Sequence, residues 1–176
     1  MISKLVLAGA LLPALLLLGQ GEVPRPSPDF TVNLPGGQAL TVQSLKGKIV
    51  VLAFISTTCP HCQALTGELT ALQKEYAGKG VQVVECAFND GVTEADAMNF
   101  STQFHPGFPI GMNHRPAVYA YLQFSSVRIL YVPHVVVIDR TGVIRGDYPG
   151  GSPFLQNAAA NLRTELNQML GAAARK

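Results

Sequence analysis

Two cysteines that are three positions apart are the residues of this chain most suited to chemistry. Cys59 and Cys62 enclose the dipeptide Pro60-His61. A cysteine thiolate attacks disulfides, and a second cysteine one helical turn further on can close a disulfide with the first. The spacing therefore predicts thiol–disulfide exchange, with the Cys59–Cys62 disulfide as the redox group and no other cofactor.

The sequence around these cysteines predicts a junction between a strand and a helix. The run Ile49–Ile55 is wholly apolar and is typical of a buried strand. Residues 60–76 carry apolar side chains at helical spacing, namely Leu65, Leu69, Leu72 and Tyr76. Cys59 then lies at the first turn of a helix, where free backbone N–H groups and the helix dipole favour a thiolate. We expect Cys59 to be the nucleophile and Cys62, deeper in the fold, to be the resolving cysteine.

The two residues between the cysteines are expected to tune the redox pair. A histidine beside a thiolate stabilises it, and a stabilised reduced form makes the disulfide more oxidising. We therefore expect Pro60 and His61 to give a couple that is more oxidising than a Cys-Gly-Pro-Cys pair. The direction of electron flow is left open.

The N-terminal segment predicts where the protein works. Lys4 precedes an apolar run, Leu5–Leu18, that contains Pro13 and is shorter than the roughly 20 residues needed to span a bilayer. We interpret residues 1–21 as a secretory signal with a cut after Gly21, or alternatively as an uncleaved membrane anchor. Both interpretations place the domain outside the cytoplasm, either periplasmic or secreted.

Length and charge limit the remaining possibilities. The chain has 176 residues and a net charge of +2, and 14% of its residues are charged. These values favour one domain and give no basic surface for nucleic acid. Residues 22–29 contain three prolines and predict a stiff extended tether rather than a folded element.

The rest of the chain, residues 30–172, predicts an α/β domain. We expect a hairpin formed by residues 30–34 and 39–42. The further expected elements are strands at 48–56, 81–88, 108–111, 134–138 and 143–148, and helices at 60–76, 93–104, 117–124 and 153–170. This order predicts a central mixed sheet flanked by helices on both faces, with an added N-terminal β-hairpin.

Three stretches of the sequence carry a family resemblance. Leu45-Lys46-Gly47-Lys48 leads into the strand before the cysteines, and Tyr131-Val132-Pro133 precedes a Val-rich strand. Together with the Cys-x-x-Cys motif, the chain resembles the extracytoplasmic thioredoxin-like proteins of the TlpA/ResA type over residues 29–170. The resemblance implies a thioredoxin-like fold and a cis-proline loop opposite the cysteines, formed by Val132, Pro133 and His134. It also implies that the partners are protein thiols or disulfides, and that a membrane redox partner is an option.

The sequence also departs from this family where the family carries acids. Ala53 occupies the position of the buried acid of thioredoxins, and Leu65 the position of the acid of ResA-type reductases. His134 stands where the reductases commonly have threonine. Glu85 is expected to point to solvent at a strand end, while the alternative is that it replaces the missing acid. The residue that transfers the proton is therefore unassigned.

Other functions remain as alternatives at this point. A Cu(I)-binding metallochaperone of the Sco type would need a histidine beside the cysteines, either His134 or His105. A thiol peroxidase would need a proline and a threonine where this chain has Leu52 and Ser56. A structural zinc site lacks a second pair of ligands. A partner-binding module with a merely structural disulfide is the last alternative.

Overall fold

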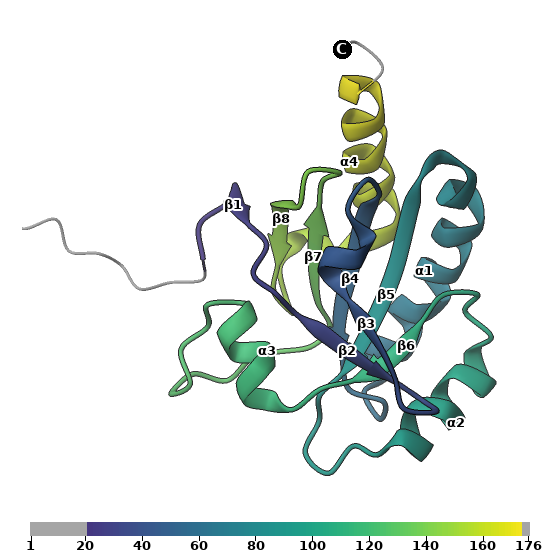
Figure 1. Ribbon diagram of the computed structural model, residues 1–176, viewed down its shortest axis with the longest axis vertical. Helices are drawn as coiled ribbons and strands as arrows, with labels where there is room; N and C mark the ends of the chain where they lie inside the picture. The colour runs from purple at the N-terminus through teal and green to yellow at the C-terminus, as the bar shows by residue number, and fades with distance from the viewer. Residues whose placement is uncertain (1–20, 174–176) are drawn as a thin grey trace, which may run out of the picture.

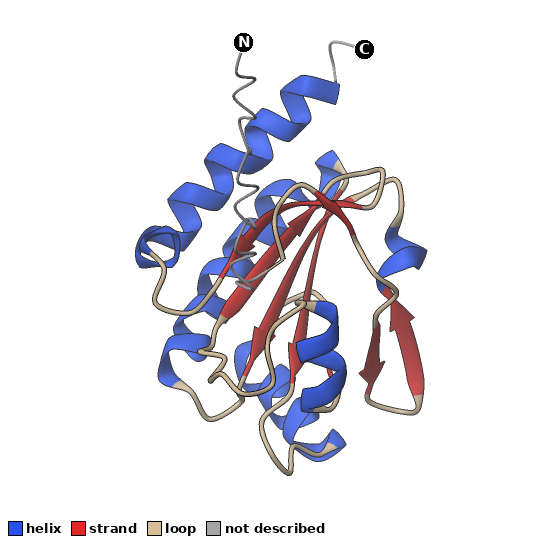
Figure 2. Cartoon of the chain, turned by 90° about the vertical axis from the view of Figure 1, so that its left-hand side faces the viewer, coloured by secondary structure: helices blue, strands red, loops and turns tan. Residues whose placement is uncertain are grey.

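The computed structural model describes residues 21–173, which form one sheet with helices on both of its sides (Figures 1 and 2). The strands are β1 (Arg25–Pro26), β2 (Thr31–Leu34), β3 (Gln38–Thr41), β4 (Ile49–Ile55), β5 (Val81–Ala87), β6 (Ile110–Met112), β7 (His134–Ile138) and β8 (Val143–Tyr148). The α-helices are α1 (Pro60–Tyr76), α2 (Glu94–Phe104), α3 (Arg115–Tyr121) and α4 (Ala158–Ala173). The sheet has the strand order β1-β8-β7-β4-β5-β6-β2-β3. The predicted α/β fold with a central mixed sheet is confirmed.

Strand β4 lies at the centre of the sheet and separates two apolar cores. All seven of its residues are buried, and it pairs parallel with β5 and antiparallel with β7. Its odd-numbered side chains, such as Ala53, pack with residues of α1 and α4. Its even-numbered side chains, such as Phe54, pack with residues of α3 and β2 on the other face. Because helices cover both faces, the strand is apolar throughout rather than alternating.

The start of α1 holds the predicted redox motif. Cys59 is the N-cap residue in an extended conformation, and Pro60 follows it in the first turn. Proline suits that position because its fixed φ is helical and its missing N–H is not needed there. The predicted helix 60–76 is confirmed with these bounds.

The N-terminal segment requires a correction. Residues 22–29 were expected to be a tether outside the fold, yet Arg25 and Pro26 form β1, which pairs antiparallel with β8 at the sheet edge. Proline is tolerated here because an edge strand has one side without ladder hydrogen bonds. The residues described include no helix long and apolar enough to cross a membrane. The predicted leader lies outside the described residues, apart from Gly21.

The predicted hairpin is present and joins the sheet at its opposite edge. Strands β2 and β3 pair antiparallel, and β2 contacts β6 through Asn33 and Met112. The final helix differs in its first turn, because Pro153–Asn157 is a 3₁₀ helix and α4 begins only at Ala158. The loop between β8 and this 3₁₀ helix lies near the start of α1, where it lines a groove beside His61.

Candidate redox site

The two cysteines differ sharply in exposure. Cys59 is partly exposed at the N-terminus of α1, whereas Cys62 is fully buried one turn later. Both are free thiols. The backbone N–H of Ser56, at the end of the β4 loop, donates a hydrogen bond of 3.4 Å to the sulfur of Cys62. An incoming partner can therefore reach the first sulfur but not the second.

The surroundings of Cys62 keep its thiol protonated. Burial raises the pKa of Cys62 far above its ordinary value, and the N–H of Ser56 opposes that rise only in part. The neighbouring Cys59 and Glu85 raise the pKa further, because each disfavours a second negative charge. Deprotonation of Cys62 therefore needs an acceptor that lies inside the protein.

A groove of about 730 Å³ runs beside the motif. His61 and Leu65 line one side of it, and Val132 and Pro133 line the other. The peptide bond between Val132 and Pro133 is cis, as the family resemblance implies. The remaining wall comes from the loop after β8 and the turn that follows it, residues Gly150, Gly151, Ser152 and Leu155. The structure thus brings His61, Val132 and Pro133 together at one groove.

Gly150 fixes the width of that groove. A side-chain carbon at this position would lie 2.6 Å from the backbone carbonyl of Tyr131. The loop after β8 and the cis-proline loop therefore pack backbone to backbone, which only glycine permits.

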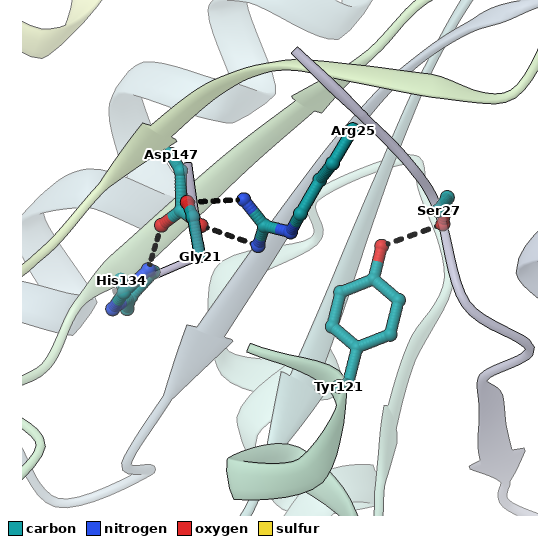
Figure 3. A network of polar contacts seen from close by, with 6 residues as sticks. All are labelled: Gly21, Arg25, Ser27, Tyr121, His134 and Asp147. Carbon is teal, nitrogen blue, oxygen red and sulfur yellow. Dashed lines mark hydrogen bonds and ion pairs between the residues drawn. The ribbon is translucent and has the colours of Figure 1, made fainter. Parts of the chain in front are cut away.

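His134, which follows the cis-proline, does not line the groove. It opposes Phe54 in the pairing of β7 with β4, and its ring contacts the ring of Phe54, on the face of the sheet that α1 does not cover. Its Nε2 lies 2.5 Å from Oδ1 of Asp147, whose Oδ2 accepts a 2.6 Å bond from Arg25 (Figure 3). His134 is fully buried in this network. It therefore supports the sheet behind the cis-proline loop and is not placed to shuttle protons to the cysteines.

The same placement removes the geometric basis of the copper alternative. That alternative needs a histidine distant in sequence, His134 or His105, beside the two sulfurs, and His134 is on the other side of the sheet. His105 is exposed at the C-terminal end of α2. Within residues 21–173 no three His, Cys, Asp or Glu side chains gather in a way that would hold a metal ion.

The structure also does not support the peroxidase alternative, because Leu52 and Ser56 place no activating side chain at the cysteines. Leu52, which stands where that mechanism needs proline, is fully buried and packs in the core on the face opposite α1. Ser56 contacts the cysteines through its backbone, whose N–H donates to the sulfur of Cys62 and whose carbonyl accepts from the N–H of Cys59. Its hydroxyl contacts the hydroxyl of Thr58 instead.

Glu85 is the functional candidate that the sequence analysis placed wrongly. We expected it to face solvent, but its side chain is fully buried under α1. It accepts hydrogen bonds of 2.9 and 3.1 Å from the hydroxyl of Thr66, and burial raises its pKa to about 8. The signal was present in the alternation of β5, because Glu85 shares its face with the buried Val83 and Ala87.

Comparison with known proteins assigns the family. A family model described as AhpC/TSA family matches residues 23–146. The chain belongs to the AhpC/TSA family. Among similar proteins, thioredoxin-like protein YneN of Bacillus subtilis is 29% identical over 125 residues, which is 70% of this chain and 69% of YneN. Thiol-disulfide oxidoreductase ResA of Bacillus cereus is 24% identical over 129 residues, or 73% of this chain and 70% of ResA. The predicted enzyme class, a thiol–disulfide oxidoreductase, is confirmed.

Solved structures confirm the thioredoxin-like fold of this AhpC/TSA family member. A thiol:disulfide interchange protein of the thioredoxin family from Chlorobium tepidum has a TM-score of 0.67 and 23% identity, and the match covers 85% of this chain and 99% of that one. A hypothetical protein from Sinorhizobium meliloti has a TM-score of 0.71 and 21% identity, covering 87% of each chain.

Proposed function

We propose that this chain is an extracytoplasmic thiol–disulfide oxidoreductase that exchanges disulfides with proteins through Cys59 and Cys62. The observation that carries the proposal is the unequal burial of the two sulfurs at the start of α1. The Cys59 residue is partly exposed, two positions before His61 on the groove, and Cys62 is fully buried.

The proposed exchange proceeds in two displacements. The Cys59 thiolate attacks one sulfur of a partner disulfide, a Cys59–partner disulfide forms, and the other partner sulfur leaves as a thiolate. The Cys62 thiol loses its proton and attacks the sulfur of Cys59. The Cys59–Cys62 disulfide forms, the second partner sulfur leaves, and the partner has gained two electrons. The reverse sequence oxidises a partner dithiol, so the residues need no cofactor in either direction.

The surface beside the groove supports a polypeptide partner. Val127, Ile129 and Tyr131 lie on the loop that precedes β7, and their exposed fractions are 92%, 72% and 67%. Tyr131 also lines the groove. Three large exposed apolar side chains within five residues of one loop suit contact with an apolar stretch of protein. We name Val127, Ile129 and Tyr131 the apolar edge.

The proposed location rests on the N-terminal sequence. The apolar run after Lys4 is typical of a secretory signal, and an extracytoplasmic site suits a stable Cys59–Cys62 disulfide. A membrane redox protein is the partner we propose for returning the pair to its starting state. Mass spectrometry of protein exported by a bacterial host tests the location, since a mature chain starting at Glu22 supports a cleaved signal and an intact leader supports the anchor.

Trapping of the mixed disulfide tests the function. We expect Cys62→Ser to accumulate a covalent adduct with reduced, unfolded ribonuclease A after oxidation with a small disulfide, and a thiol reductant should release it. Cys59→Ser should form no adduct. Wild-type protein should catalyse insulin reduction or ribonuclease refolding. Absence of adducts, together with blank results in both assays, would leave only a partner-binding module.

A further inference from the structure

We propose that Glu85 exchanges a proton with the Cys62 thiol during disulfide exchange, acting from β5 in place of the acid that β4 lacks. The inference rests on the proposed function, because it assigns the proton that the second displacement must move. Glu85 takes up and returns this proton, and Thr66 holds its carboxyl group beside the backbone of Cys62.

The register of the sheet places Glu85 beside the vacant acid position. In the parallel pairing of β4 with β5, Glu85 lies directly opposite Ala53. Paired residues of neighbouring strands point to the same face and are separated by one strand spacing, about 4.8 Å. Both side chains belong to the face that α1 covers. The carboxyl group therefore lies one strand away from the acid position of thioredoxins, which Ala53 occupies here, and it is still under the helix that carries the cysteines.

Thr66 connects this carboxyl group to Cys62. Its Oγ1 lies 3.0 Å from the carbonyl oxygen of Cys62 and 2.9 Å from one oxygen of Glu85, and the three residues are buried. When Glu85 is ionised, the Thr66 hydroxyl donates to the carboxylate. When Glu85 is protonated, its own O–H donates to Thr66 Oγ1, and Thr66 donates to the carbonyl of Cys62. Thr66 thus satisfies both protonation states of Glu85 without a rearrangement of the backbone.

Within residues 21–173, no cation lies near Glu85 that would hold it ionised. Across the sheet it meets Ala53 on β4 and Ile110 on β6. On α1 it meets Thr66 and the neighbourhood of Cys62, and the apolar core on this face includes Phe100 of α2. Among the described residues that face it, Cys62 is therefore the titratable one. Burial raises the pKa of Glu85 to about 8, so both forms are accessible near neutral pH.

The proton balance of the second displacement follows. With a partner joined to Cys59, the Cys62 thiol gives its proton to the Glu85 carboxylate and attacks the sulfur of Cys59. The Cys59–Cys62 bond forms, the bond from Cys59 to the partner breaks, and the partner sulfur leaves with the electron pair. In the reverse direction, protonated Glu85 supplies the proton that Cys62 takes up when its disulfide bond opens. Because both groups are acids in one dry site, a shared proton avoids two buried negative charges.

A two-step reaction with the chromogenic disulfide DTNB tests the proposal. Reduced protein should release one thionitrobenzoate when Cys59 attacks and a second when Cys62 resolves the adduct. In wild-type protein the second rate should rise with pH and level off near pH 8. In Glu85→Gln the second step should slow by at least about tenfold at pH 8, because a positioned proton acceptor contributes at least that much to a rate. The rate of the first step should stay within about twofold of the wild-type rate. In this variant the rate of the second step should keep rising above pH 8 with no inflection.

Three further variants separate this role from a structural one. Glu85→Asp restores a carboxyl group and should restore the inflection. Glu75→Gln is the matched control, because it makes the same substitution on the solvent side of α1 and should change neither step. Thr66→Val keeps Glu85 but removes the hydroxyl that holds its carboxyl group, so it should also slow the second step. This variant tests the inference even if the Glu85 variants fold poorly. An unchanged inflection in folded Glu85→Gln would overturn the inference, whereas loss of the second release in wild-type protein would overturn the proposed function instead.

Discussion

Oδ1 of Asp147 lies 2.5 Å from Nε2 of His134, and this buried pair ties β8 to the residue that follows the cis-proline. The other oxygen of the carboxylate accepts the bond from Arg25, which in turn donates to the carbonyl of Gly21 (Figure 3). One carboxylate thereby joins three strands, β1, β8 and β7. Residues 22–29, predicted to be a tether, therefore contribute strand β1 to the edge of the domain.

Asp147→Asn should destabilise the fold. Burial acts to raise the pKa of Asp147, but the hydrogen bonds and charges of His134 and Arg25 outweigh it and leave the pKa below its ordinary value. Removing one partner of a buried ion pair costs about 3 kcal/mol, which urea denaturation at pH 7 measures. The folded pKa is lowered, so wild-type protein should lose this contribution as the pH falls below about 4, and the variant should not.

Asp90→Asn is the control for this change. Asp90 also pairs with an arginine, Arg115, but 84% of its side chain is exposed. Solvent-exposed pairs contribute less than about 1 kcal/mol. Equal losses in the two variants would mean that the Asp147 network does not hold the strands together.

Glu85→Gln should make the protein more stable in mild alkali. The folded pKa of Glu85 is raised to about 8 by burial, with Thr66 opposing the shift, whereas the unfolded value is close to 4.5. The folded state therefore binds the proton more tightly, and wild-type stability should fall as the pH rises from about 5 to 8, by up to about 1.4 kcal/mol per pH unit. Denaturant titrations at several pH values should show a flatter profile for Glu85→Gln, and Glu75→Gln should retain the wild-type slope.

Local patterns in the sequence predicted the junction of β4 and α1 because both elements have simple periodicities. The seven apolar residues of β4 and the stripe from Leu65 to Tyr76 each match one kind of element. The position of Glu85 depends instead on which strand pairs with β4 and on a helix covering that face. The alternation of β5 groups Glu85 with Val83 and Ala87, but it reveals neither the neighbouring strand nor the helix that covers this face.

The edge strand β1 was missed for a related reason. Three prolines in residues 22–29 indicate an extended chain, and β1 is indeed extended. Its inclusion in the fold comes from Asp147, more than 100 residues away, which pairs with Arg25. The placement of His134 depends on the same long-range contact, so the sequence around the cis-proline did not exclude a role at the cysteines.

Gly150→Ala should disturb the groove. The new Cβ would lie 2.6 Å from backbone atoms of Tyr131, and backbone yields less easily than a flexible side chain. We expect a loss of about 1–3 kcal/mol and slower insulin reduction. Gly67→Ala is the matched control, since a Cβ there meets nothing within 4 Å, and in α1 it should stabilise the protein by about 0.5–1 kcal/mol. A neutral Gly150→Ala would show that the two loops are not packed tightly.

His61→Ala should make the redox couple more reducing. His61 is exposed in the first turn of α1 and lines the groove beside the cysteines. Its imidazole stabilises a nearby thiolate and therefore the reduced form. We expect the potential, measured against glutathione, to become more negative by about 30 mV, which equals about 1.4 kcal/mol for two electrons. His114→Ala, an exposed histidine that begins α3, should leave the potential unchanged.

Ile129→Ser should weaken exchange with polypeptides while sparing small disulfides. The side chain of Ile129 is 72% exposed at the centre of the apolar edge, so its removal leaves no cavity in the core. If an extended protein segment lies along this edge, loss of the contact should raise KM for reduced, unfolded ribonuclease A about tenfold, the equivalent of about 1.4 kcal/mol. Reaction with glutathione disulfide, which presents no extended apolar segment, should keep its rate. Met98→Ser removes a half-exposed apolar side chain from α2 and should change neither reaction. Equal effects of Ile129→Ser on both substrates would show that the apolar edge supports the cis-proline loop rather than binding the partner.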